Sequence, residues 1–79
     1  HRYVILAQTK EKQNAYEEAL GYYQQAITIF EKVPNSANRE LGNLYFSVGS
    51  IYSKLGEYFK ASFYHSCSMD IREKTVPRD

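Results

Sequence analysis

The sequence lacks any long hydrophobic run, and it has a single cysteine, Cys67. No stretch approaches the roughly 18 to 20 consecutive apolar residues that span a bilayer, and no series resembles a signal peptide. We therefore expect no insertion into a membrane. One cysteine cannot form a disulfide within the chain, which favours a reducing compartment. A cytoplasmic location is the resulting expectation.

Blocks of like charge are also absent. The ten Lys and Arg residues and the nine Asp and Glu residues are interspersed along the chain, and the formal net charge is +1. Nucleic-acid-binding surfaces need clustered positive charge, because they must neutralise backbone phosphates. The composition therefore predicts no nucleic acid partner.

The usual signatures of catalysis and of metal binding are missing as well. The chain has no glycine-rich phosphate loop, no Gly-x-Ser-x-Gly sequence and no constellation of Ser, His and Asp. His65 and Cys67 stand two residues apart, which places them on different faces of a helix, and no second pair has zinc-ligand spacing. We expect a protein that is not an enzyme, with no catalytic residue, no metal site and no cofactor.

What the sequence does contain is an internal repeat with a period of 42 residues. Such self-similarity is typical of stacked repeat architectures. It divides the chain into units at residues 1–35 and 36–79, which we interpret as part of a longer array. The identical pairs at this period are Tyr3/Tyr45, Lys12/Lys54, Tyr16/Tyr58, Ala19/Ala61, Tyr22/Tyr64, Ile29/Ile71, Glu31/Glu73 and Lys32/Lys74.

Each unit is predicted to form two helices, at about residues 1–13 and 15–33 and at about 37–55 and 57–75. Apolar residues recur with the i, i+3, i+4, i+7 spacing of one helical face, which in the second unit includes Leu55 and Tyr58. Gly56 is expected to end a helix in the left-handed conformation. The Val33-Pro34-Asn35-Ser36 segment predicts a turn between the units. Short connections make neighbouring helices antiparallel.

Small and aromatic residues recur at fixed offsets in both units. They are Tyr45, Val48, Gly49, Tyr52, Gly56, Tyr58 and Ala61 in the second unit, and Tyr3, Leu6, Ala7, Asn14, Tyr16, Ala19, Tyr23 and Ala26 in the first. This pattern resembles the tetratricopeptide repeat. The resemblance implies an all-α fold of two stacked antiparallel helical hairpins within a right-handed α-solenoid. The period exceeds the usual value of about 34 residues and is similar to the extended repeats of kinesin light chains and related adaptors.

The same resemblance implies a scaffold or adaptor whose concave wall, built from the first helix of each unit, binds a peptide or helix of another protein. Any one wall residue could instead simply face solvent. Phe46 stands out, because an exposed aromatic among serines is costly unless it contacts a partner. The positions so implied are Val4, Gln8, Glu11, Lys12, Asn43, Phe46, Ser47, Ser50, Ser53 and Lys54.

Two other functions fit the same pattern: a peptide-sensing regulatory domain of a larger signalling protein, and a structural spacer in a large assembly. Units of this kind bury their faces only against neighbours. We therefore expect contacts with neighbouring repeats, or self-association of the chain.

Phe59 and Phe63 stand one helical turn apart, on the face that the repeat geometry turns outward. Glu17 and Gly21 occupy the equivalent places in the first unit, so the fold does not require apolar residues there. Two interpretations remain open. Either further chain covers the two phenylalanines, or they form a second contact surface on the convex side.

Overall fold

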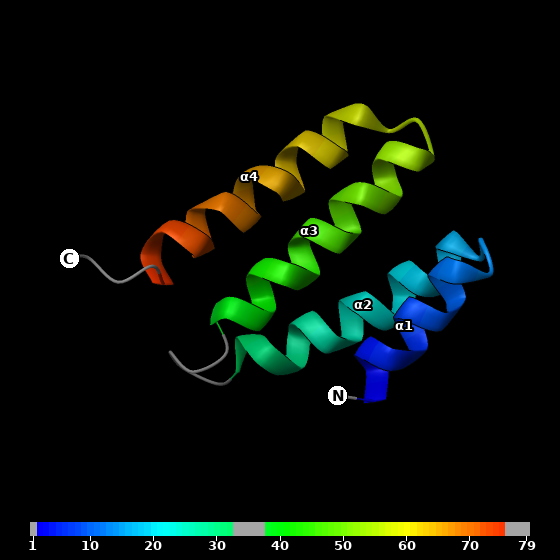
Figure 1. Ribbon diagram of the computed structural model, residues 1–79, viewed down its shortest axis with the longest axis horizontal. Coiled ribbons are helices and arrows are strands. Elements are labelled where there is room, and N and C mark those ends of the chain that lie inside the picture. The colour runs from blue at the N-terminus through cyan, green and yellow to red at the C-terminus, as the bar shows by residue number, and fades with distance from the viewer. Residues whose placement is uncertain (1, 33–37, 76–79) are drawn as a thin grey trace.

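The computed structural model describes residues 2–32 and 38–75, which form four helices (Figure 1). No strand occurs within those ranges. The all-α prediction is confirmed, and each helix end lies within two residues of its predicted place. The predicted turn at 33–36 lies outside the described residues. The helices are α1 (Arg2–Lys12), α2 (Tyr16–Glu31), α3 (Asn38–Lys54) and α4 (Tyr58–Thr75).

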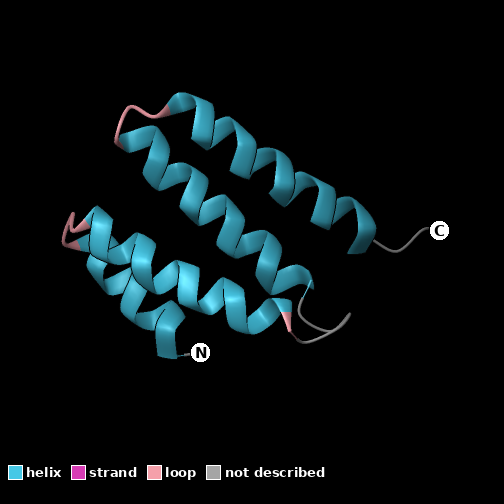
Figure 2. Cartoon of the chain, turned by 180° about the vertical axis from the view of Figure 1, so that it is seen from behind, coloured by secondary structure: helices cyan, strands magenta, loops and turns pink. Residues whose placement is uncertain are grey.

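The helices pack in chain order as two antiparallel hairpins. α1 packs against α2 and α3 packs against α4, while the contact between α2 and α3 joins the hairpins. Both hairpin turns lie at the same end of the molecule, as Figures 1 and 2 show from opposite sides. This arrangement is the stack of hairpins that the sequence predicts.

The turn inside each hairpin has the same geometry. Asn14 and Gly56 both have positive φ, at 63° and 83°. Glycine adopts this left-handed conformation without a steric penalty, and asparagine tolerates it better than most residues. In both turns a backbone bond closes the end of the preceding helix. These bonds run from the Ala15 N–H to the Lys10 carbonyl and from the Glu57 N–H to the Tyr52 carbonyl, each at 2.9 Å.

A pair of stacked tyrosines also recurs at the repeat period. The Tyr3 and Tyr22 rings lie 6.3 Å apart between centroids in the first hairpin. The Tyr45 and Tyr64 rings lie 6.0 Å apart in the second, with a similar interplanar angle. The repeat in the sequence is therefore a repeat in three dimensions, with the same residue-to-residue register.

The core runs between the helices and depends on small residues where backbones approach closely. A Cβ added at Gly49 would lie only 3.1 Å from the Ala61 carbonyl oxygen of α4. Ser68 of α4 lies between the same two helices and donates a hydrogen bond of 2.8 Å to the Gly42 carbonyl of α3. The buried hydrophobic residues are Ala7, Ala19, Tyr23, Ala26, Ile27, Leu41, Leu44, Val48, Ile51 and Ala61.

Two residues predicted to face inward are exposed instead. Leu55, directly after the end of α3, is 42% exposed, and Tyr58 at the start of α4 is 70% exposed. Tyr16, the equivalent of Tyr58 in the first hairpin, is half-buried, and Lys54 of α3 lies over its ring. Within the described residues no helix covers the corresponding side of α4, so Tyr58 has no equivalent neighbour.

Candidate functional site

A cleft of about 460 Å³ opens between α1 and α3. Tyr23 of α2 forms its floor, with 1% of its surface exposed. The remaining lining consists of polar and charged side chains from the facing sides of α1 and α3. These are Gln8, Glu11, Lys12, Ser47 and Lys54.

The structure thus brings together five of the ten residues predicted for the concave wall. The other five lie outside the cleft. Val4 is half-buried and packs against the core, whereas Asn43 is exposed. Phe46, Ser50 and Ser53 also belong to α3 but do not line the cleft.

Glu11 is the centre of the polar contacts in the cleft. The Tyr23 hydroxyl donates a hydrogen bond of 2.9 Å to Glu11 Oε1, and Lys54 Nζ lies 3.9 Å from Glu11 Oε2. Lys54 Nζ also lies 5.7 Å from the centroid of the Tyr16 ring. One carboxylate therefore links α1, α2 and α3. The partly exposed ion pair itself contributes little to stability.

Lys12 differs from Lys54 in its surroundings. It ends α1 and is exposed, and it forms no ion pair with any residue in the described ranges. Its ammonium group and that of Lys54 both stand at the C-terminal ends of helices, where the helix dipole favours positive charge. The cleft thus offers two cations at one end.

Tyr23 is the lining residue that the sequence analysis missed, because the helical spacing assigns it to the core. Its ring is indeed in the core, whereas its hydroxyl reaches Glu11. The sequence does indicate this contact, because a tyrosine rather than a phenylalanine occupies a core position and a buried tyrosine hydroxyl usually has a hydrogen-bond partner.

The environment of the Tyr23 hydroxyl changes its acidity. Burial, together with the hydrogen bond to the Glu11 carboxylate, raises the pKa of Tyr23 from 10.0 to about 12, and the nearby Ser47 hydroxyl partly offsets this rise. Burial and the 2.8 Å hydrogen bond to Glu31 likewise raise the pKa of Tyr45. Both hydroxyls therefore remain protonated at neutral pH.

We expect the raised pKa of Tyr23 to make the free energy of unfolding fall at alkaline pH. The folded-state pKa of Tyr23 lies above its unfolded value, so the unfolded chain loses this proton first. The stabilising contribution is complete below pH 10 and is lost between about pH 10 and pH 12. In Tyr23→Phe, urea unfolding should show a smaller drop in unfolding free energy over this range, by at most about 3 kcal/mol. Identical pH profiles for the two proteins would show that Tyr23 titrates as it does in the unfolded chain.

Phe46 is half-exposed, at 47%, but it points along the α4 side of α3. Its ring stacks on His65 with 5.0 Å between centroids. The Arg72 guanidinium lies 5.6 Å from the centre of the same ring. Both neighbours belong to α4, so Phe46 forms part of a surface between α3 and α4.

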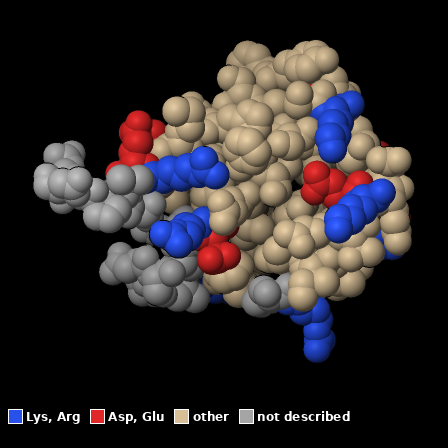
Figure 3. All heavy atoms as spheres, viewed as in Figure 1, with Lys and Arg blue, Asp and Glu red and all other residues tan. Residues whose placement is uncertain are grey.

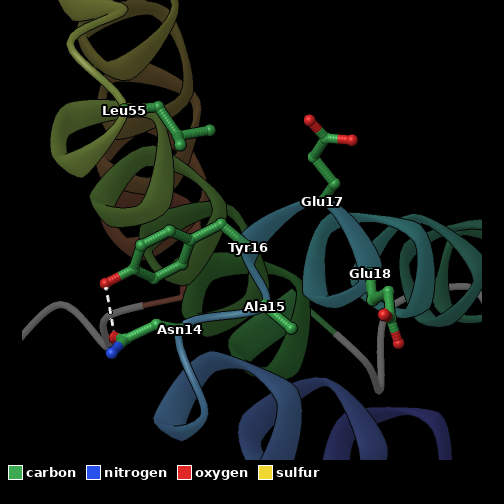
Figure 4. A pocket seen from close by; sticks show the side chains of 6 residues that line it. All are labelled: Asn14, Ala15, Tyr16, Glu17, Glu18 and Leu55. Atoms are coloured by element: carbon green, nitrogen blue, oxygen red, sulfur yellow. Dashed lines mark hydrogen bonds between the residues drawn. The ribbon is translucent and has the colours of Figure 1, made fainter.

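A second hollow lies at the end where the hairpin turns gather, as Figure 4 shows. The Tyr16 hydroxyl donates a 3.0 Å hydrogen bond to Asn14 Oδ1 there. Glu17 and Glu18 point in different directions, and Leu55 closes the opposite side. Because its polar groups do not converge on one point, this hollow offers little to orient a ligand.

The outer side of α4 carries the two phenylalanines singled out in the sequence. Phe59 is 91% exposed and Phe63 is 60% exposed, and together with Ser62 and Ser66 they border a shallow hollow. The prediction that they face outward is confirmed. A second contact surface there stays a prediction.

The charge distribution agrees with the mixed sequence pattern. On the face seen in Figure 3, acidic side chains lie beside basic ones, and no broad patch of one sign appears. Among the described residues, no group of three or more His, Cys, Asp and Glu could hold a metal ion. No helix in that part of the chain is long and apolar enough to cross a bilayer.

Comparison with known proteins identifies one family. Its model, described as tetratricopeptide repeat, matches residues 3–74. The matched region includes both hairpins and every residue that lines the cleft. No curated protein and no solved structure matches the chain.

Proposed function

Because the chain belongs to the tetratricopeptide repeat family, whose repeats are generally protein–protein interaction modules, we propose that it is the binding segment of a scaffold or adaptor. In this proposal, the cleft between α1 and α3 holds a peptide or helix of another protein. The adaptor is not an enzyme and acts in the cytoplasm.

The convergence of polar groups on one cleft is the observation that carries this proposal. The Gln8 amide can both donate and accept hydrogen bonds, and the Ser47 hydroxyl can do the same, which suits the N–H and C=O groups of a peptide backbone. Lys12 and Lys54 can bind acidic side chains of the partner. Glu11, held by Tyr23, remains available to a basic group or an N–H donor.

The same lining supports binding rather than catalysis. It contains neither histidine nor cysteine. Ser47 lies beside the Tyr23 hydroxyl, which is protonated at neutral pH and cannot act as a base there. A serine nucleophile needs an adjacent group that accepts its proton, and the one carboxylate of the lining, Glu11, already accepts a hydrogen bond from Tyr23.

A pair of alanine substitutions tests the proposal. Peptides would first be selected from a displayed library on the unaltered chain, and their affinities measured by fluorescence anisotropy. Gln8→Ala with Lys54→Ala should weaken binding about tenfold or more, because losing roughly 1.4 kcal/mol of interaction has that effect. The substitutions remove partly exposed polar groups, so the fold should persist.

The matched control replaces Gln25 and Lys32 by alanine, which are exposed residues of the first hairpin outside the cleft. The control should bind like the unaltered chain. Equal affinities for both double variants would place the peptide elsewhere. If selection yields no binding peptide at all, the result would favour the interpretation of the chain as a structural spacer.

A further inference from the structure

Lys54 stands apart from the carboxylate beside it in the cleft. Its Nζ lies 3.9 Å from Glu11 Oε2, whereas charge-assisted hydrogen bonds between nitrogen and oxygen are about 2.7 to 2.9 Å long. The ion pair between Lys10 and Glu18, at 3.1 Å, is much closer. The side chain of Lys54 is 53% exposed, so its ammonium group can still donate hydrogen bonds to a bound molecule.

Tyr23 accounts for this separation. Its hydroxyl donates a hydrogen bond of 2.9 Å to Glu11 Oε1, and the residue that carries the hydroxyl is only 1% exposed. A side chain packed in the core keeps one conformation, and it therefore holds the carboxylate that it binds. The Glu11 side chain is itself only 23% exposed. Glu11 is thus fixed toward α2 and does not follow Lys54.

The charged residues that line the cleft leave an excess of one positive charge. Lys12 and Lys54 are the cations of the lining, and Glu11 is its anion. A carboxylate bound between the two ammonium groups would cancel the excess. A second carboxylate would instead add a negative charge beside Glu11, and like charges repel more strongly in a partly enclosed site than in bulk water. The lining therefore suits a ligand with one acidic side chain.

A peptide with a basic side chain fits this lining less well. Such a group would have to approach Glu11, because the lining contains no other carboxylate. Lys54 Nζ lies 3.9 Å from Glu11 Oε2 and would repel a second cation there. A backbone N–H of the peptide carries no full charge, so it can bond to Glu11 without this repulsion.

We propose that the peptide in this cleft carries one acidic side chain, which binds between Lys12 and Lys54, and that Tyr23 is the positioning residue for this specificity. The proposal rests on the proposed function, because it names the class of peptide that the cleft accepts. Tyr23 holds Glu11 away from Lys54, so the carboxylate of the peptide forms the short ion pair in its place.

Matched peptides test the charge preference. One selected peptide with a single acidic residue would be synthesised with two analogues. The first replaces the acidic residue by its amide, and the second adds another acidic residue beside it. At low salt the amide analogue should bind about tenfold more weakly, because it loses the charge-assisted hydrogen bonds, and added salt should reduce the difference. The analogue with two acidic residues should bind no more tightly than the parent peptide.

A matched pair of chain variants locates the preference, measured as the ratio of the affinities for the acidic peptide and its amide analogue. Lys12→Gln should lower this ratio several-fold. Lys32→Gln removes the same charge from an exposed residue outside the cleft and should leave the ratio unchanged. An equal effect of both variants would show that overall charge, and not the cleft, attracts the acidic peptide.

Tyr23→Phe separates positioning from a structural role. Without the hydroxyl, Glu11 can move to Lys54 and compete with the peptide, so the ratio should fall several-fold while the affinity for the amide analogue is unchanged. Structural damage would weaken both peptides alike. In a chain with Glu11→Gln, Tyr23→Phe should not change the ratio, because the glutamine has no charge with which to compete. Glu11→Gln alone should let the peptide with two acidic residues bind more tightly than the parent peptide.

The outcomes distinguish this proposal from the proposed function. Equal affinities for the acidic peptide and its amide analogue would overturn the specificity and leave the binding cleft intact, and so would a selected set of peptides without acidic residues. A ratio that is the same in Tyr23→Phe would overturn the positioning role. If Gln8→Ala with Lys54→Ala bound every peptide like the unaltered chain, both proposals would fail.

Discussion

Replacing Ile51 by alanine is expected to lower the free energy of unfolding by about 3 kcal/mol. Ile51 is fully buried and belongs to the face of α3 that packs on the first hairpin. Truncating a buried isoleucine loses the transfer free energy of the removed carbons and leaves a cavity, with a typical cost of about 2 to 5 kcal/mol. Because small domains have only about 5 to 15 kcal/mol of stability, this loss would be readily seen in urea unfolding followed by circular dichroism.

Ile5→Ala is the matched control for this substitution. Ile5 is 62% exposed, on a helix of the other hairpin. The same chemical change should therefore cost only a few tenths of a kcal/mol. If both variants lost the same small amount, the contact between the hairpins would not be a stabilising interface.

Gly49→Ala is expected to destabilise the chain by about 1 to 2 kcal/mol, although alanine is the better helix former by about 1 kcal/mol. A Cβ at this position would overlap His65 Cδ2 and would lie 2.7 Å from His65 Nε2 and 3.1 Å from the Ala61 carbonyl oxygen. α3 and α4 would have to move apart. Thermal unfolding should therefore shift to lower temperature.

Gly21→Ala, the same substitution at an exposed position, is expected to stabilise the chain. Nothing lies within 4 Å of a Cβ at Gly21, which is on the exposed side of α2. Only the difference in helix propensity acts at this position, and stability should rise by up to about 1 kcal/mol.

The His65→Ala change tests the contact at Gly49. In a chain that carries it, Gly49→Ala should destabilise less than in the unaltered chain. A penalty that is independent of His65 would show that the ring does not limit the approach of the two helices.

The sequence was sufficient to predict the features that depend on local periodicity. The helices and the left-handed residue at Gly56 follow from residue types and spacing within about one turn of the chain. The outward direction of Phe59 and Phe63 follows instead from the repeat geometry that the family resemblance implies. Gly49 matches Ala7 of the first unit, so the repeat pattern marks this position as one for small residues. The close approach of α4 that requires the small size is seen only in the structure.

Features that depend on contacts between distant residues were harder to predict. The spacing assigned Tyr23 to the core, but only the fold brings its hydroxyl to Glu11. Phe46 was predicted for the concave wall. The structure stacks its ring on His65, a contact between helices that spacing along α3 could not show, and its contact with a partner stays a prediction. Helical spacing placed Tyr58 on the inward face, as it placed Tyr16 at the same position of the first unit. α3 lies against Tyr16, whereas within the described residues no helix lies against Tyr58 in the same way.

The central claim is that a partner binds in the cleft between α1 and α3, and site-specific photo-crosslinking tests it most directly. A photoreactive amino acid would replace Gln8, which lines the cleft, or Gln24, which is exposed elsewhere on the same hairpin. With a selected peptide bound, we expect a cross-linked product from position 8 and little from position 24. Efficient cross-linking at position 24 with none at position 8 would contradict the claim.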